Sequence, residues 1–161
     1  MVINTVNNSS AESEMLKEMG FNDKISERMK LEMLIWRMFI TNLVIQEKSK
    51  ELNDPFHNTI LLKIYKQKKE IDNILALVHD RYKEYYNHIN SGNDIKILYL
   101  SMTYLDYFIN GKITSFSKYS DKEKLFSVSY AIVEDFAKFM NFTRMNIFNN
   151  KFVQAETINW R

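Results

Sequence analysis

The stretch MLIWRMFITNLVI, Met33 to Ile45, decides the fold because it is apolar almost all the way round a helical wheel. Its 13 residues are too few to span a bilayer, which takes ~20. We therefore expect no membrane span, but a central helix that is packed on several sides. At ~100° per residue, Lys30, Arg37, Thr41 and Lys48 share a sector about 40° wide. This spacing predicts that Arg37 lies on a thin polar stripe that reaches water.

Capping and breaking residues set the limits of the helices around this stretch. Ser9 and Glu12 form a capping-box pattern, which predicts a short first helix that ends at Gly20. The central helix is predicted over residues 24–53, because Asp54-Pro55 can end it and begin the next helix. Residues 1–10 are predicted to form a polar tail.

The next helix is predicted to be long, from residue 55 to about residue 91. Apolar residues recur in it every seven positions, at Ile64, Ile71, Val78 and Tyr85. This period is typical of a coiled-coil seam. The polar run around Gln67 interrupts the seam, so the helix is expected either to be more exposed there or to bend.

Two more helices complete the predicted fold. One covers residues 94–110 and ends at Gly111, and the other runs from Lys124 to Met140 behind a capping box formed by Ser120 and Glu123. Its apolar stripe consists of Leu125, Val128, Ile132, Phe136 and Phe139. Residues 142–161 are predicted to be a tail that packs back. The sequence thus predicts a single all-α domain, residues 1–161, built as one bundle of about five helices.

Composition excludes several kinds of site. The chain of 161 residues has no cysteine, which rules out disulfides, thiolate metal sites and cysteine nucleophiles. It has only three glycines and contains neither a phosphate-binding loop nor a nucleophile elbow. The beginning of the sequence lacks the basic and apolar segments of a secretory signal, so a cytoplasmic location is expected.

The segment RYKEYYNH, from Arg81 to His88, carries an Arg and a His separated by six residues. It resembles the R-x4-6-H motif of the HEPN ribonucleases, which are small all-α proteins that often dimerise. The resemblance covers these eight residues and the helical character of the chain, and Tyr82 stands where the family favours a polar residue. It implies a metal-independent ribonuclease in which Arg81 stabilises phosphate charge and His88 moves the proton of the 2′-hydroxyl. The alternative is that both are surface groups at a helix end.

Asp80, Glu84 and His88 lie four residues apart on one side of the same predicted helix. Such a row could hold a divalent metal, but no second His–carboxylate pair supports it. Salt bridges with neighbours such as Lys83 are the preferred interpretation. No metal site and no cofactor are therefore expected.

Lysines gather on the long predicted helix around Tyr65; they are Lys63, Lys66, Lys68 and Lys69. Basic and aromatic side chains together can hold single-stranded nucleic acid. The formal net charge of +2, with its basic excess toward the C-terminus, allows this possibility without requiring it. A solvated surface is the simpler interpretation of the lysines.

Large apolar side chains are abundant, and the tyrosines Tyr85, Tyr86, Tyr99, Tyr104 and Tyr107 are candidate anchors for a partner. Core filling is the alternative. We expect the protein to be a non-enzymatic interaction module, such as a small regulator, adaptor or inhibitor. It would bind a protein partner, or itself as a homo-oligomer, through a helical face. A HEPN-like ribonuclease and a nucleic-acid-binding protein are the two alternatives.

Overall fold

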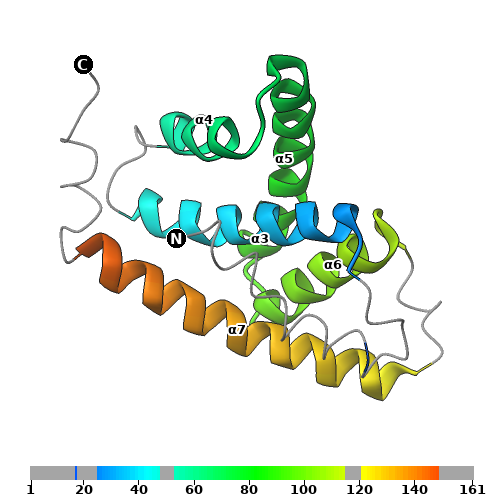
Figure 1. Ribbon diagram of the computed structural model, residues 1–161. Helices are drawn as coiled ribbons and strands as arrows, with labels where there is room; N and C mark the ends of the chain where they lie inside the picture. The colour runs from blue at the N-terminus through cyan, green and yellow to red at the C-terminus, as the bar shows by residue number, and fades with distance from the viewer. Residues whose placement is uncertain (1–16, 18–24, 48–52, 115–120, 149–161) are drawn as a thin grey trace.

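The computed structural model describes residues 17, 25–47, 53–114 and 121–148 (Figure 1). Helices make up 84% of these residues, which contain no strand. The helices are α3 (Glu27–Gln46), α4 (Asn53–Ile64), α5 (Lys68–Ile89), α6 (Lys96–Asn110) and α7 (Lys122–Phe148). The predicted all-α bundle is confirmed. The predicted first helix and polar tail lie outside the described residues, apart from Lys17.

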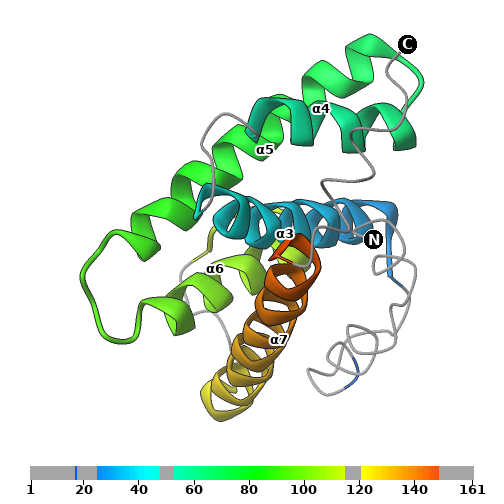
Figure 2. The same cartoon turned by 90° about the vertical axis from the view of Figure 1, so that its left-hand side faces the viewer.

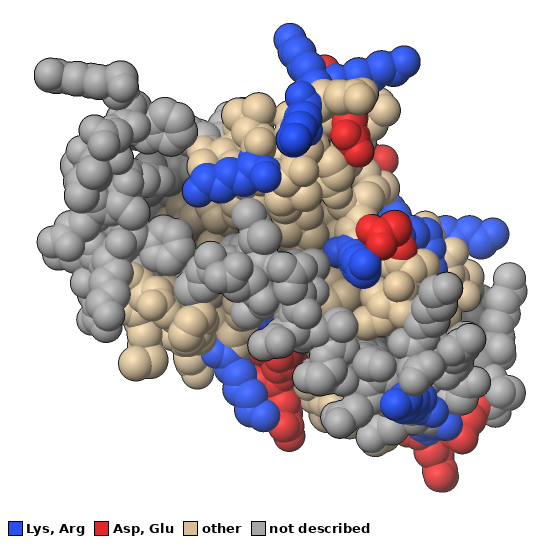
Figure 3. Space-filling view, viewed as in Figure 1, with Lys and Arg blue, Asp and Glu red and all other residues tan. Residues whose placement is uncertain are grey.

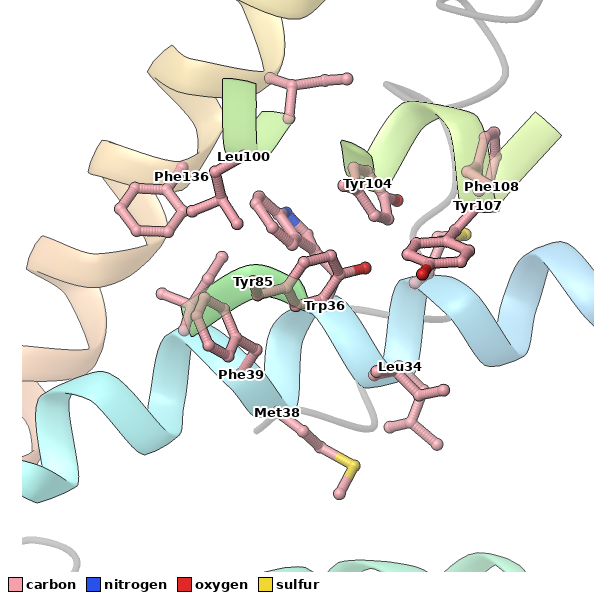
Figure 4. Packing of buried hydrophobic residues seen from close by; sticks show 14 of the residues in the cluster. Leu34, Trp36, Met38, Phe39, Tyr85, Leu100, Tyr104, Tyr107, Phe108 and Phe136 are labelled. Atoms are coloured by element: carbon pink, nitrogen blue, oxygen red, sulfur yellow. The ribbon is translucent and has the colours of Figure 1, made fainter. Parts of the chain in front are cut away.

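Helix α3 is the centre of the bundle, as its apolar sequence predicts. Its Trp36 stacks on Tyr104 of α6 with 4.5 Å between ring centroids, and meets Tyr85 of α5 edge-on at 5.4 Å. Phe136 of α7 lies 5.6 Å from the same indole. Figure 4 shows these rings converging on Trp36 from the three neighbouring helices. One side chain thus joins four helices, and aromatic contacts of this kind add to the stability given by burial.

The long helix predicted over residues 55–91 is two helices, α4 and α5, separated at residues 65–67. The seam residues Ile71, Val78 and Tyr85 are buried in α5 as predicted, whereas Ile64 is 37% exposed at the end of α4. The polar residues 66–70 are all exposed and offer nothing to bury, so no packing keeps the two helices on one axis. Figure 1 shows α5 running in a different direction from α4.

Helix α6 ends where the sequence predicts. Gly111 follows its last residue with φ 71°, the left-handed conformation that favours glycine at this position. Arg28 of α3 donates from Nη1 to the carbonyl of Tyr107 and from Nη2 to that of Ile109, both at 2.7 Å. These carbonyls belong to the last turn of α6, whose acceptors have few partners within the helix. Arg28 therefore attaches the end of α6 to the beginning of α3.

Helix α7 carries the predicted stripe, and all five of its residues are buried: Leu125, Val128, Ile132, Phe136 and Phe139. The helix is longer than predicted, because residues 142–148 of the predicted tail continue it. Asp121 accepts a hydrogen bond at Oδ1 from the amide of Lys124, at 2.9 Å, as an N-cap residue does. The predicted cap, Ser120, lies outside the described residues.

The prediction that Arg37 lies on a wet stripe is wrong. Arg37 is 8% exposed and Thr41 is 1% exposed. The guanidinium Nη1 of Arg37 lies 2.8 Å from Asp135 of α7, and its central carbon lies 4.6 Å from the centroid of the Phe139 ring. Helix α7 crosses beneath α3 (Figure 2), and Arg37 and Thr41 are buried, whereas Lys30 is exposed and Lys48 lies outside the described residues. Among the described helices, none is long and apolar enough to cross a bilayer.

Candidate functional site

Arg81 of α5 is held in a buried ion pair with Glu32 of α3. Its Nη2 donates to Glu32 Oε1 at 2.8 Å and its Nε donates to Oε2 at 3.1 Å, so both oxygens of the carboxylate accept a hydrogen bond. Glu32 is 1% exposed. Such a two-point contact fixes both side chains in one orientation.

The other neighbours of Arg81 also restrain it. Its guanidinium lies 3.6 Å from the centroid of the Tyr107 ring, and its Nη2 donates to the carbonyl of Gly111 at 3.3 Å. Burial opposes the charge of Arg81, but the hydrogen bonds and charge of Glu32 outweigh it and raise the pKa of Arg81 above its ordinary value. Arg81 therefore joins α5, α3 and the end of α6 as a permanent cation.

No motif in the sequence pointed to Glu32 as a site residue. The signal was its position, directly before the apolar run that starts at Met33, where a charged residue needs a partner. Its partner stands 49 positions further along the chain. No pattern in the sequence indicated which basic residue would face it.

His88 lies in a different environment. Its Nε2 is 2.8 Å from the hydroxyl of Thr103, and its ring stacks on that of Tyr99. Burial lowers the pKa of His88 below its ordinary value, while the charge of Glu84 acts in the opposite direction. The neutral ring is therefore favoured at neutral pH.

Arg81 and His88 thus contact different parts of α6. Arg81 faces the end of that helix, at Tyr107 and Gly111, whereas His88 faces Tyr99 and Thr103, nearer to its beginning. A ribonuclease site would need both side chains to reach one phosphate. Each is instead bonded to a neighbouring helix.

The carboxylates considered as metal ligands beside His88 do not form a site. Asp80 is exposed and Glu84 is partly exposed on the surface of α5. Within the part of the chain that the structure describes, no group of three or more His, Asp or Glu side chains is arranged to hold a metal ion.

The five candidate tyrosines separate into two groups. Tyr85, Tyr104 and Tyr107 are buried where α5 and α6 pack against each other and against α3. They therefore fill the core, and only Tyr86 and Tyr99 remain available to a partner. Tyr86 is half-buried and its hydroxyl accepts a hydrogen bond from Asn42 at 2.9 Å, while Tyr99 is exposed beside His88.

The four candidate lysines, Lys63, Lys66, Lys68 and Lys69, are all exposed where α4 ends and α5 begins. Tyr65 among them is half-buried and packs against the core. Figure 3 shows basic side chains gathered at the top of the molecule, over the end where α5 begins in Figure 1. Acidic side chains lie at the same end in Figure 3, and the exposed Glu70 and Asp72 follow the lysines on α5.

The outer side of α7 carries apolar side chains that the sequence analysis did not single out. Phe126 is 44% exposed and Tyr130 is 58% exposed, and the partly buried Val133 follows them on the same side of the helix. At ~100° per residue these three lie within about 60° of one another. We call them the outer row. The only signal in the sequence was a second set of apolar residues at helical spacing beside the predicted stripe.

The outer row and the end formed by α4 and α5 are two surfaces of the described structure that carry exposed apolar side chains beside charges. Compared with protein-family models, curated proteins and solved structures, this chain gave no match in any of the three.

Proposed function

We propose that the protein is a non-enzymatic interaction module that binds through the outer row of α7, and that its first partner is a second copy of the same chain. The observation that supports this is the exposure of Phe126 and Tyr130 on a helix whose opposite stripe is fully buried. Aromatic side chains at the centre of a surface patch are the residues that most often dominate binding energy.

A symmetric pairing fits the sequence of α7. If two copies of α7 run antiparallel about a two-fold axis at Tyr130, residues equally far from the axis face one another. The two Tyr130 rings then meet, and Phe126 of each copy packs near Val133 of the other. The pairing removes the aromatic rings of both copies from water.

The charges beside the outer row fit the same arrangement. Glu123 and Lys138 lie at similar distances on either side of Tyr130 and along the same edge of the row. The two-fold axis therefore brings Glu123 of each copy close to Lys138 of the other. Among the residues that the structure describes, Lys138 pairs with Glu134 of its own chain at 3.5 Å, and this exposed contact is weak enough to be exchanged. A small regulator or adaptor that works as a dimer would use such a face.

Sedimentation equilibrium tests the proposal. We expect a mass near twice the 19.3 kDa of the monomer at micromolar concentration, and the monomer mass for Tyr130→Glu, which places two like charges at the axis. Met145→Glu is the matched control, because Met145 is 65% exposed on the same helix but lies off the row. This control should remain dimeric.

Charge exchange tests the orientation of the two helices. Glu123→Lys should weaken the dimer by placing two lysines near each other, and adding Lys138→Glu should restore it. A wild-type protein that stays monomeric at every concentration contradicts the proposal. A dimer that is insensitive to Tyr130→Glu means that another face forms the contact.

A further inference from the structure

The end of the molecule where α4 meets α5 carries charge and apolar surface together. Leu62 is 66% exposed and Ile64 is 37% exposed, and Lys63, Lys66, Lys68 and Lys69 surround them in the sequence and are exposed. Residues 62–69 contain no acidic side chain, and the exposed Glu70 and Asp72 follow them on α5. We call the two aliphatic side chains and the four lysines the lysine tip.

The lysine tip projects from the rest of the bundle. Figures 1 and 2 both show the beginning of α5 extending beyond α3, away from α6 and α7. Leu62 points away from the face formed by the buried Ile60 and Leu61, since it lies about 150° round the helix from the midpoint between them. A flat surface could therefore approach the tip without meeting α7.

We propose that the lysine tip docks on the surface of an anionic lipid bilayer. Exposed aliphatic side chains enter the boundary between headgroups and acyl chains, and lysines beside them keep their ammonium groups at the level of the headgroups because their stems are long and flexible. Each lysine near an anionic surface contributes about 1 kcal/mol, which suits this stretch of four.

A nucleic acid could also bind the four lysines, but it matches the exposed aliphatic side chains of the lysine tip less well than a bilayer does. Bases stack on exposed flat rings, and the aromatic residue in this stretch is Tyr65. That ring is half-buried against the core, and burial raises the pKa of its hydroxyl, with the charges of Glu70 and Glu27 adding to the rise. The side chains that do reach solvent here, Leu62 and Ile64, are aliphatic and offer bases no stacking surface.

Vesicle co-sedimentation of the full chain tests the proposal. We expect binding to phosphatidylcholine vesicles that contain phosphatidylserine, weakened by added salt, and much weaker binding to vesicles of phosphatidylcholine alone. Lys66→Gln with Lys69→Gln should lower the affinity roughly 30-fold, which is two lysines at about 1 kcal/mol each. Leu62→Asp should lower it as well, because the side chain would carry a negative charge into the interface.

The matched control removes the same charge elsewhere. Lys83→Gln on α5 with Lys112→Gln after α6 removes the same charge from two exposed positions outside both the outer row and the tip, and should bind vesicles like the wild type. Equal loss in both double variants would show that net charge alone acts, and would overturn the proposal. So would equal binding to neutral vesicles, or binding of a single-stranded oligonucleotide by the lysine tip without any binding to anionic vesicles. Circular dichroism of each variant confirms that these exposed substitutions leave the helices intact.

Discussion

Glu32 and Arg81 face each other across the packed helices α3 and α5 with two hydrogen bonds, at 2.8 and 3.1 Å. Both side chains are buried, so each charge depends on the other for the interactions that water would otherwise supply. Removing one partner is therefore expected to cost more than removing both.

Arg81→Met should lower the free energy of unfolding by roughly 3–5 kcal/mol, because it leaves the charge of Glu32 buried without its partner. Adding Glu32→Leu should recover much of that loss, since a well-packed apolar pair of similar volume is often tolerated. Urea denaturation of the wild type, the two single variants and the double variant measures this coupling. Lys30→Met is the control, because its pair with Glu27 is exposed and should contribute below about 1 kcal/mol. Losses that simply add would show that the pair is not coupled.

Arg37 tests how α7 is seated on α3. Arg37→Gln should destabilise the protein by roughly 1.5–3 kcal/mol, because it removes the ion pair with the partly exposed Asp135 and the contact with the Phe139 ring. Arg37→Lys should lose less, since the charge remains while the planar stacking is lost. Thermal denaturation against Lys83→Gln, an exposed position on α5, provides the comparison. A negligible effect of Arg37→Gln would indicate that this side of α3 is open to water, as the helical wheel alone suggests.

The comparison of Arg37 with the α7 stripe shows what the sequence could and could not predict. The spacing of Leu125, Val128 and Ile132 identifies a buried face because one helix suffices to define it. Whether Arg37 is exposed to solvent depends on a second helix about 100 residues further along the chain, and no local pattern contains that information. The same reason explains why the partner of Arg81 was missed. The exposed outer row on α7 was visible as spacing, but its exposure depends on where the other helices lie.

Gly111 and Gly92 form a matched pair of glycines with nearly equal left-handed φ values, 71° and 68°. An alanine at either position meets the same backbone cost, about 1 kcal/mol or more. A Cβ at Gly111 would also lie 3.3 Å from Cδ and Nη1 of Arg28, whereas one at Gly92 would meet nothing within 4 Å. Gly111→Ala should therefore be the more destabilising change by urea denaturation. The difference should disappear in an Arg28→Ala background, and its persistence there would show that Arg28 is not the cause.

His88 predicts a dependence of stability on pH. Because burial lowers its pKa in the folded state, the unfolded chain binds a proton more readily. The contribution of neutral His88 to the free energy of unfolding is fully present above about pH 6.5, the ordinary pKa of histidine in an unfolded chain. It is lost as the pH falls from there toward the lower pKa that His88 has in the folded protein. The stability difference between the wild type and His88→Gln should therefore shrink from pH 7.5 to pH 5.5 when measured by thermal denaturation. A difference that is constant over this range contradicts burial as the cause.

The HEPN resemblance of Arg81 and His88 has a direct chemical test. A metal-independent site needs a free base and a cation that reach one phosphate, so a ribonuclease of this type would cleave single-stranded RNA in the presence of EDTA. We expect no cleavage, because Glu32 holds Arg81 by two hydrogen bonds while His88 contacts Thr103 at a different part of α6. Cleavage by the wild type that falls ~10²–10⁴-fold in His88→Ala would contradict the interaction-module proposal. Thr103→Val is the matched control, because it removes the neighbour of His88 and leaves the ring itself. An enzyme would keep activity in Thr103→Val and lose it in His88→Ala, whereas a purely structural contact changes only the stability of both variants.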